Sequence, residues 1–343
     1  SDTVNTVRPN AVDEGVRWET TNTLNLGVDF GFFEGRLTGS IDAYNKVTSD
    51  LLLDIIFPIG LIPGDRAVTN VAELQSRGVE FLINTVAVDK SDFRLDIGFN
   101  AAYNKNEIKR LNRSNDPDDP GIRIGGISGD VGRTIQVWRV GESNLAFYTY
   151  EHKRDANGNP LPDGEDFNGD NLENDLDIYV DQNDDGQINE NDLVVKDKAD
   201  PDWIFGLTAN AQYKKFDLSM TWRGSLGNSV YNNVFSQFGN FDGVQGSGFS
   251  NNIHATAYDT EFEDRQLLSD YYVQDASFIK LDNITIGYSF SLIEKIKGRA
   301  YITGTNLLNI TPYEGLDPEI GGLSGIDNNA YPRSQMYIVG CNV

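Results

Sequence analysis

An alternation of apolar and polar side chains between residues 18 and 48 constrains the fold more than any other feature of the chain. One face carries Trp18, Leu24, Leu26, Val28, Phe30 and Phe32, and the other carries Glu19, Thr21, Thr23, Asn25, Gly27, Asp29 and Gly31. A period of two predicts a β-strand. About fifteen residues is far longer than the ordinary strand of about five or six.

A tight turn is expected at Glu34 and Gly35, because glycine accepts the positive φ that a two-residue hairpin requires. The chain then returns with Leu37, Gly39, Ile41, Ala43 and Val47 on one face and Arg36, Thr38, Ser40, Asp42 and Lys46 on the other. Two long strands, each apolar on one side and polar on the other, are typical of a sheet that stands between lipid and water.

The same alternation recurs along the chain and predicts eleven strands in total. They lie around residues 18–32, 36–47, 79–84, 93–104, 133–140, 144–152, 203–213, 216–223, 277–291, 298–308 and 334–343. Helical periodicity is absent from the pattern, so the predicted class is all-β.

The connections between these strands alternate between short and long. Short turns are expected at 34–35, 89–91, 141–143, 214–215 and 294–298, and long loops at about 54–76, 107–131, 153–202 and 231–272. An outer-membrane barrel segregates its connections in this way, with short periplasmic turns and long external loops. Aromatic residues near the strand ends (Trp18, Phe32, Trp203, Tyr213) suit an interfacial girdle. The alternative is a large soluble β-protein that buries one face of each strand.

Composition narrows the function classes. The chain of 343 residues has a net charge of −24, which argues against nucleic acid as a partner. Residues 153–202 hold sixteen acidic and four basic residues, so half of the excess lies in one predicted loop. The single cysteine, Cys341, excludes an internal disulfide and a metal site built from cysteines. No apolar run is long enough for a membrane helix, whereas a transmembrane strand needs only about 9–11 residues.

Eleven strands cannot close as a typical bacterial barrel, whose strand number is even. An open edge cannot stand alone in lipid, because its backbone groups would lack hydrogen bonds. We therefore expect an antiparallel transmembrane β-barrel fragment that occupies residues 1–343.

Several stretches resemble the C-terminal barrel of TonB-dependent transporters of the SusC/RagA type. They are residues 18–52, 76–84, 93–111, 181–195, 200–232, 275–290, 302–311 and 330–343, of which DASFIKLDNITIGYSF (275–290) and ITGTNLLNIT (302–311) are the most specific. Their order and spacing match the family along nearly the whole chain.

The resemblance implies the second half of a plugged barrel of about 22 strands, with the plug domain and the N-terminal strands absent from this sequence. It further implies active import of large nutrients, glycans or oligopeptides, across the outer membrane rather than enzymatic catalysis. The implied partners are a SusD-type surface lipoprotein, the TonB complex acting through the missing N-terminal part, and outer-membrane lipid. Two other hypotheses stay open: a secreted, calcium-stabilised β-rich binding protein, and a passive porin.

Residues 181–192 (DQNDDGQINEND) match a calcium-binding loop. The expected ligands are the side chains of Asp181, Asn183, Asp185, Asn189 and Asp192 and the backbone carbonyl of Gln187. Gly186 stands at position 6, where the loop turns sharply, and position 12 is Asp in place of the usual bidentate Glu. The alternative is a solvated acidic turn. Asp166, Asn168 and Asp170 begin a similar pattern, but Asn171 replaces the glycine, so we expect no second loop of this kind.

Two further sets of residues have both a functional and a structural interpretation. Polar strand residues that are expected to face the lumen either contact a plug or substrate or form a hydrated wall: Arg94, Asp96, Asn100, Asn210, Asp217 and Arg223. Aromatic residues of the loop 231–272 either stack on sugars or a partner or pack within the loop: Tyr231, Phe235, Phe238, Phe241 and Phe249. No catalytic motif is recognisable, and specific substrate-binding residues are not assigned.

Overall fold

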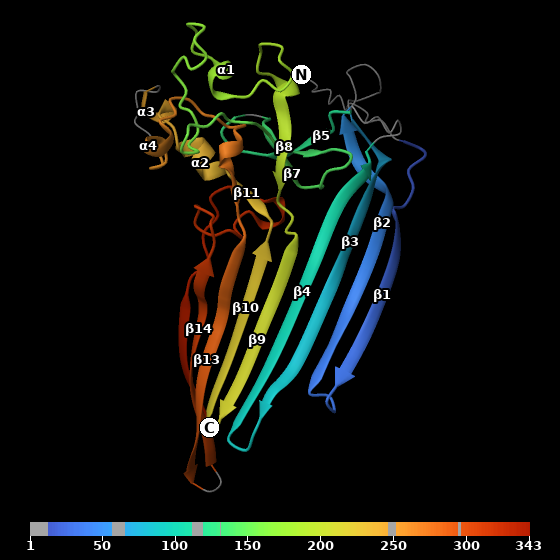
Figure 1. Ribbon diagram of the computed structural model, residues 1–343, viewed down its shortest axis with the longest axis vertical. Helices are drawn as coiled ribbons and strands as arrows, with labels where there is room; N and C mark the ends of the chain where they lie inside the picture. The colour runs from blue at the N-terminus through green and yellow to red at the C-terminus, as the bar shows by residue number, and fades with distance from the viewer. Residues whose placement is uncertain (1–12, 57–65, 112–118, 131, 246–251, 294–295) are drawn as a thin grey trace, which may run out of the picture.

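One long antiparallel sheet of nine strands dominates the described structure. The computed structural model describes residues 13–56, 66–111, 119–130, 132–245, 252–293 and 296–343. The strand order is β1-β2-β3-β4-β9-β10-β13-β14-β16, and Figure 1 shows these strands running side by side below a compact outer part. Their bounds are β1 Thr20–Phe32, β2 Leu37–Ile56, β3 Arg66–Asp89, β4 Phe93–Arg110, β9 Trp203–Tyr213, β10 Phe216–Leu226, β13 Phe278–Ile293, β14 Ile296–Ile310 and β16 Met336–Asn342.

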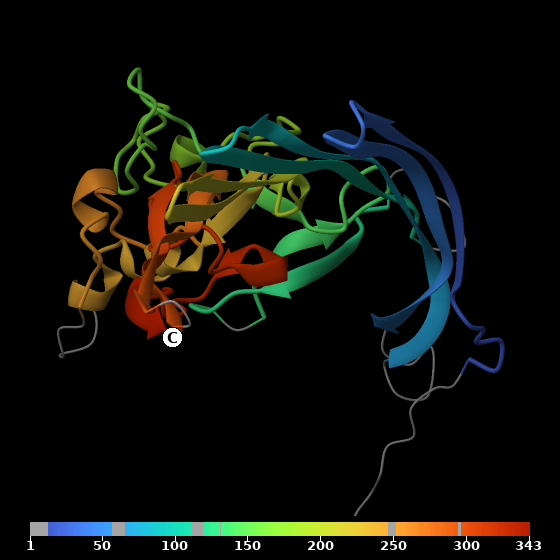
Figure 2. The same ribbon diagram turned by 90° about the horizontal axis from the view of Figure 1, so that it is seen from below.

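The long sheet is curved and open. Figure 2 shows it as an arc whose ends do not meet, and among the described strands β1 and β16 each have one neighbour only. Every pairing within it is antiparallel. The predicted all-β class and the barrel-like curvature are therefore confirmed.

The register places one kind of side chain on each face of the sheet. One continuous row of paired residues is apolar or small: Val28, Ile41, Phe81, Ala101, Phe205, Gly224, Ile279 and Ile310. A row of the opposite parity is polar or small: Gly31, Thr38, Asn84, Gly98, Thr208, Thr221, Asn283 and Thr305. The sheet thus has an apolar face and a polar face, as the alternation predicts.

Aromatic rows mark both ends of the apolar face. At the short-turn end Phe93, Tyr213, Phe216 and Tyr288 are consecutive cross-strand partners. At the other end the rings of Tyr103 and Trp203 lie 5.2 Å apart. The 11 residues of β9 join the two rows. They rise about 33 Å, which at a tilt of about 40° spans the ~25 Å height of a transmembrane apolar band.

In the described part of the chain, large side chains of the apolar face are exposed rather than buried. Leu26, Val28 and Val339 are exposed by 70%, 65% and 81%. So many exposed large apolar side chains on one face of a sheet indicate contact with another apolar phase. No helix in the described part of the chain is both long and apolar enough to cross a membrane.

The buried core lies in a cap at the end of the sheet opposite the short turns (Figure 1). The cap contains a four-stranded sheet, a three-stranded sheet and short helices. The strands are β5 Ile122–Gly126, β6 Thr134–Trp138, β7 Ala146–Tyr150, β8 Leu193–Lys198, β11 Ser229–Asn232, β12 Val273–Asp275 and β15 Ile326–Asp327. The helices are α1 Asp175–Ile178, α2 Asn233–Phe238, α3 Asp242–Gln245 and α4 Ala257–Thr260, with 3-10 turns η1 Glu190–Asp192, η2 Asp270–Tyr272 and η3 Gly322–Ser324.

The prediction of eleven barrel strands is wrong by two. The strands predicted at 133–140 and 144–152 exist as β6 and β7, but they belong to the cap sheet β5-β6-β7-β8. β4 pairs directly with β9, so everything between these two strands is one external insertion. The physical reason is length, since β6 and β7 have 5 residues each and a transmembrane strand needs about 9–11. The short connection 141–143 accordingly lies in the cap.

Two other predicted connections differ or fall outside the described residues. The loop predicted at 54–76 is shorter, because β2 continues to Ile56 and β3 begins at Arg66. Residues 57–65 themselves, and residues 294–295 of the predicted turn at 294–298, lie outside the described part of the chain.

The cap core joins segments that are far apart in the sequence. Its fully buried side chains include Ile135, Phe147, Tyr231, Phe262 and Tyr272. Each large aromatic side chain removes about 150–250 Å² from water, so this cluster is a major stabilising contribution to the cap.

His152 is the polar centre of this core and is 2% exposed. Its Nδ1 lies 2.9 Å from the Ser269 hydroxyl, and its Nε2 lies 2.9 Å from the Leu161 carbonyl oxygen. Burial lowers the pKa of the imidazole, against smaller raising effects from the Leu161 carbonyl and Asp270. His152 therefore acts as a neutral hydrogen-bonding link between the insertion after β7 and the segment before β12.

A charge on the apolar face should prevent stable assembly of the complete protein. Val28→Arg, near the middle of β1, is expected to cost about 2–4 kcal/mol, because the guanidinium would face hydrocarbon. Thr23→Arg places the same side chain on the polar face of the same strand and should be tolerated. Heat-modifiable migration of the folded barrel on gels measures the effect. Equal tolerance of both substitutions would contradict the assignment of the two faces.

Candidate functional site

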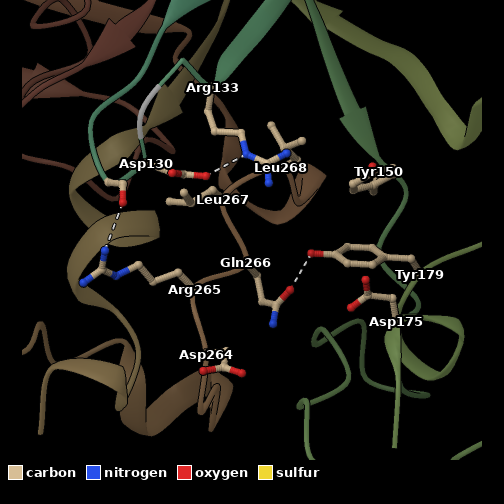
Figure 3. A pocket seen from close by; sticks show the side chains of 11 residues that line it. Asp130, Arg133, Tyr150, Asp175, Tyr179, Asp264, Arg265, Gln266, Leu267 and Leu268 are labelled. Carbon is tan, nitrogen blue, oxygen red and sulfur yellow. Dashed lines mark hydrogen bonds and ion pairs between the residues drawn. The ribbon is translucent and has the colours of Figure 1, made fainter. Parts of the chain in front are cut away.

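A cavity of about 500 Å³ opens between several segments of the cap. Figure 3 shows its lining side chains, which come from the β5–β6 connection, the end of β7, α1 and the segment before η2. We call it the cap pocket, and it is lined by Gly129, Asp130, Arg133, Tyr150, Asp175, Tyr179, Asp264, Arg265, Gln266, Leu267 and Leu268.

A chain of hydrogen bonds fixes the floor of the cap pocket. The Tyr179 hydroxyl donates to Gln266 Oε1 at 2.7 Å, and Gln266 Nε2 donates to Asp163 Oδ2 at 2.9 Å. Asp163 also accepts from the backbone N–H groups of Glu263 and Asp264, at 2.6 and 2.8 Å. Because both ends of the Gln266 amide are engaged, its orientation is set before any ligand arrives.

Tyr150 and Tyr179 form the aromatic wall of the cap pocket. Their ring centroids are 5.1 Å apart. The Tyr150 backbone N–H donates to the Leu268 carbonyl at 2.8 Å, which ties the end of β7 to the opposite wall. Burial raises the pKa of the Tyr150 phenol, and the nearby Arg133 opposes this effect in part. The phenol is therefore neutral and can both donate and accept a hydrogen bond.

Local sequence positions the remaining wall. Asn174 caps α1 by accepting from the Leu176 N–H, and Asp177 accepts from the Asn174 N–H in return. This capping box places Asp175 and Tyr179 one turn apart at the pocket.

The charged lining residues fall into two classes. Arg133 Nε pairs with Asp130 Oδ2 at 2.9 Å, and Arg265 Nη2 pairs with Asp242 Oδ2 at 3.1 Å. In the part of the chain that the structure describes, the carboxylates of Asp175 and Asp264 neither accept a hydrogen bond nor form an ion pair.

The cap pocket could not be predicted from the sequence. Its walls come from distant parts of the sequence: Tyr179 and Gln266, 2.7 Å apart, are separated by 87 residues, and Arg265 and Gly129, 3.0 Å apart, by 136. No local motif marks such a convergence. The burial of His152, which links the insertion after β7 to Ser269, could not be predicted from the local pattern either.

The predicted calcium loop, residues 181–192, folds into a compact turn with its side-chain oxygens directed inward. Asp181 Oδ2 accepts from the Gly186 N–H at 2.8 Å, and Asp185 Oδ1 accepts from the Gln187 N–H at 2.9 Å. Asn189 caps η1, and the buried Asp192 accepts from the Gln182 and Asn189 N–H groups at 2.9 and 2.8 Å. The N–H groups, that of Gly186 above all, lower the pKa of Asp181.

The residues of this loop fit a hard cation in the chemistry of their donors, which are all oxygen. Gly186 has the positive φ of 77° that position 6 requires. Among the described residues, however, no three His, Cys, Asp or Glu side chains gather closely enough to hold a metal ion. The loop therefore has the expected turn and donor set, while its carboxylates are engaged by backbone N–H groups.

The register of the pattern that begins at Asp166 does not fail at Asn171, contrary to expectation, while the expectation that this turn is not a calcium loop stays a prediction. Asn171 adopts a φ of 65° and so replaces the glycine at position 6. Asp166 accepts from the Asn171 N–H at 2.9 Å, as Asp181 does from Gly186, and Asp177 closes the turn as Asp192 does. Asparagine is among the few residues that reach the left-handed region at low cost, so the turn survives the substitution.

A cluster of charged side chains on the polar face of the sheet anchors the connection between β14 and β16. Lys280 is 1% exposed, and its Nζ lies 2.6 Å from Asp317 Oδ1 and 2.6 Å from Glu319 Oε2. Arg223 donates from Nε to Asp282 at 2.6 Å and from Nη1 and Nη2 to the two carboxylate oxygens of Glu319. Burial acts to raise the pKa of Glu319, but the hydrogen bonds from Arg223 and Lys280 dominate and lower it to about 2.

The structure places the predicted lumenal residues on one face and pairs several of them. Asp96 pairs across strands with Asn210, and Asn100 lies in the row that continues to Arg223. Arg94 forms an ion pair with Asp96 at 2.8 Å. Asp217 pairs with Arg299 across Gly287, where a Cβ atom would meet both side chains. Ion pairing within the wall accounts for these charges.

The loop aromatics mostly pack within the cap. Tyr231 and Phe235 are 0% and 6% exposed, and the Phe235 ring stacks on His254 at 4.4 Å. Phe241 contacts Tyr258 edge to face at 5.6 Å. Phe238 is 39% exposed, and Phe249 lies outside the described residues.

Comparison with known proteins gives consistent matches along the chain. Residues 2–163 match the family model for TonB dependent receptor-like β-barrels. The TonB-dependent receptor SusC of Bacteroides thetaiotaomicron is 37% identical, over 98% of this chain and 33% of its own length. A TonB-dependent receptor of Formosa agariphila is 28% identical, over 96% of this chain and 34% of its own length.

Solved structures agree in fold. The RagAB peptide transporter superposes with a TM-score of 0.69 at 22% identity, over 94% of this chain and 35% of that chain. The RagAB peptide importer in its closed-closed state gives 0.68, also at 22% identity. The chain thus spans about a third of the length of the relatives it matches. It belongs to the TonB-dependent receptors of the outer membrane, as a section of their β-barrel.

Proposed function

We propose that the complete protein imports large nutrients, glycans or oligopeptides, across the outer membrane with energy from the TonB complex. The observation that carries the proposal is the pairing of a lipid-facing apolar sheet with an elaborate polar cap, in a chain 37% identical to SusC. A barrel with a purely structural role in the membrane would not require such a cap. Capture of a large polar solute does require an external binding surface.

The proposed partners are supported by the similarity to TonB-dependent receptors. The TonB complex acts through a part of the protein that this sequence does not include. A SusD-type lipoprotein covers the cap from outside and delivers the nutrient. We propose no enzymatic activity, since the family consists of receptors and transporters.

The two other hypotheses carry less weight. A secreted binding protein would bury its apolar surface, whereas Leu26 and Val28 are exposed by 70% and 65%. A passive porin needs an open water-filled lumen, whereas the ion cluster around Lys280 holds the β14–β16 connection against the inner face. Dependence on energy separates the porin from the transporter directly.

Deletion of the gene for the complete protein should abolish growth on at least one polymeric nutrient. The measurement is growth of the deletion strain on single purified polysaccharides and on a protein digest as sole carbon source. A plasmid copy of the gene should restore growth, and inactivation of TonB in the complemented strain should remove it again. Unchanged growth on every nutrient, or uptake that persists without TonB, would contradict the proposal.

We also propose that residues 181–192 bind calcium as a structural ion that stiffens the acidic insertion. The support is the oxygen-only donor set and the turn at Gly186. The side chains of Asp181, Asn183, Asp185, Asn189 and Asp192 and the carbonyl of Gln187 would hold the ion. Its charge would offset part of the acidity of residues 153–202.

Calcium should slow amide hydrogen exchange in residues 181–192 of the complete receptor. Asp181→Asn should weaken the effect on the order of tenfold in calcium concentration, because one charged ligand is lost. Asp184→Asn is the matched control, since Asp184 is exposed, lies in the same loop at a non-ligand position, and has a φ of 58° that asparagine tolerates. No protection at millimolar calcium, or equal loss in both variants, would refute the site.

A further inference from the structure

The cap pocket has the size of a small-molecule site but a polar lining. Its volume of about 500 Å³ lies within the ordinary range of about 300–1,000 Å³. Carboxylates, guanidiniums, an amide and phenols form most of the lining, with Leu267 and Leu268 as the aliphatic members. An apolar ligand would remove these groups from water without replacing their hydrogen bonds, which is unfavourable. The occupant is therefore polar.

Charge disfavours an anionic occupant. The two lining arginines are already paired with Asp130 and Asp242. The charges that remain without a partner are the carboxylates of Asp175 and Asp264. The adjoining insertion, residues 153–202, adds sixteen acidic against four basic residues. A sulfate, phosphate or uronate group would enter a negative field.

The arrangement of the carboxylates also disfavours a compact cation. A metal ion or an ammonium group is bound best where several acidic oxygens converge. No three acidic or metal-ligating side chains of the described residues gather in this way. In Figure 3, Asp175 and Asp264 come from different segments, with Asp175 to the right of Gln266 and Asp264 below it. Acceptors that are spread around a cavity match a ligand whose donors are spread in the same way.

Hydroxyl groups satisfy both kinds of partner that the pocket offers. Carboxylates only accept and guanidiniums only donate, whereas a hydroxyl does both. The carboxylates of Asp175 and Asp264 supply hydrogen-bond acceptors. The phenol of the half-buried Tyr150 can both donate and accept a hydrogen bond. Gln266 and Tyr179 keep the floor rigid, so ordering the site for a ligand costs little.

We propose that the cap pocket is a binding subsite for a segment of an uncharged oligosaccharide. Asp175 and Asp264 accept hydrogen bonds from its hydroxyl groups, and Tyr150 packs beside a sugar ring. The proposal rests on the nutrient import proposed above and selects glycans over oligopeptides as the class captured at this place.

The test is isothermal titration of the complete receptor in detergent. The probes are linear hexasaccharides of glucose, mannose, galactose and xylose, together with hexagalacturonate as an anionic glycan and a mixed hexapeptide pool. At least one neutral hexasaccharide should bind, and Asp175→Ala and Asp264→Ala should each weaken it about tenfold, as expected for a hydrogen bond to a charged group.

Glu263→Ala is the matched control. Glu263 is an exposed acid next to Asp264 that does not line the pocket, so its removal changes the charge but not the binding. Both test residues have side chains without partners, so their substitution leaves the fold intact.

Three results would overturn the inference while leaving nutrient import untouched. They are binding of a neutral hexasaccharide that neither substitution weakens, preference for the anionic glycan or the peptides, and failure of every neutral probe at millimolar concentration. Failure of import itself would appear instead as unchanged growth of the deletion strain on every nutrient.

Discussion

The structure depends on one constraint: backbone N–H and C=O groups cannot be left without hydrogen bonds in a hydrocarbon phase. The nine long strands satisfy it by pairing each neighbour in continuous antiparallel register, from β1 to β16. Because the side-chain period of a strand is two, the same register sorts the residues onto a lipid face and an inner face. The segments of the cap are insertions between the strands of this sheet. The two outermost strands are the places where further strands of the receptor's barrel must continue the pairing.

The cap is stabilised differently from the sheet. Its core is a conventional buried cluster around Phe147, Tyr231 and Tyr272, and His152 links its segments as a neutral group. The cap is joined to the sheet through charge, because Lys280 and Arg223 on the strands hold Glu319 of the β14–β16 connection. Breaking one partner of such a buried set is costly, since the remaining charge keeps no counter-ion. The external surface is thereby fixed relative to the barrel wall.

The sequence predicts the sheet well and the cap poorly, for physical reasons. A strand such as β4 or β9 is specified by its own alternation, so residues like Phe93 and Trp203 reveal both the element and its outward face. The short strands β6 and β7 alternate too, but they are buried on both faces, so the pattern alone could not separate them from the barrel. The turn at Asn171 was missed because asparagine can replace glycine there. The cap pocket depends on contacts between distant segments, such as Tyr179 with Gln266, which no local pattern encodes.

The central claim is that one face of the long sheet contacts lipid and the other contacts water. Site-directed spin labelling along β2 of the complete receptor tests it most directly, with Cys341 replaced by serine because it is an exposed free thiol. Labels at Ser40, Ile41, Asp42 and Ala43 should alternate. At Ile41 and Ala43 collisions with oxygen should exceed those with a water-soluble nickel complex, and at Ser40 and Asp42 the order should reverse. Equal accessibility at all four positions, or the opposite alternation, would contradict the account.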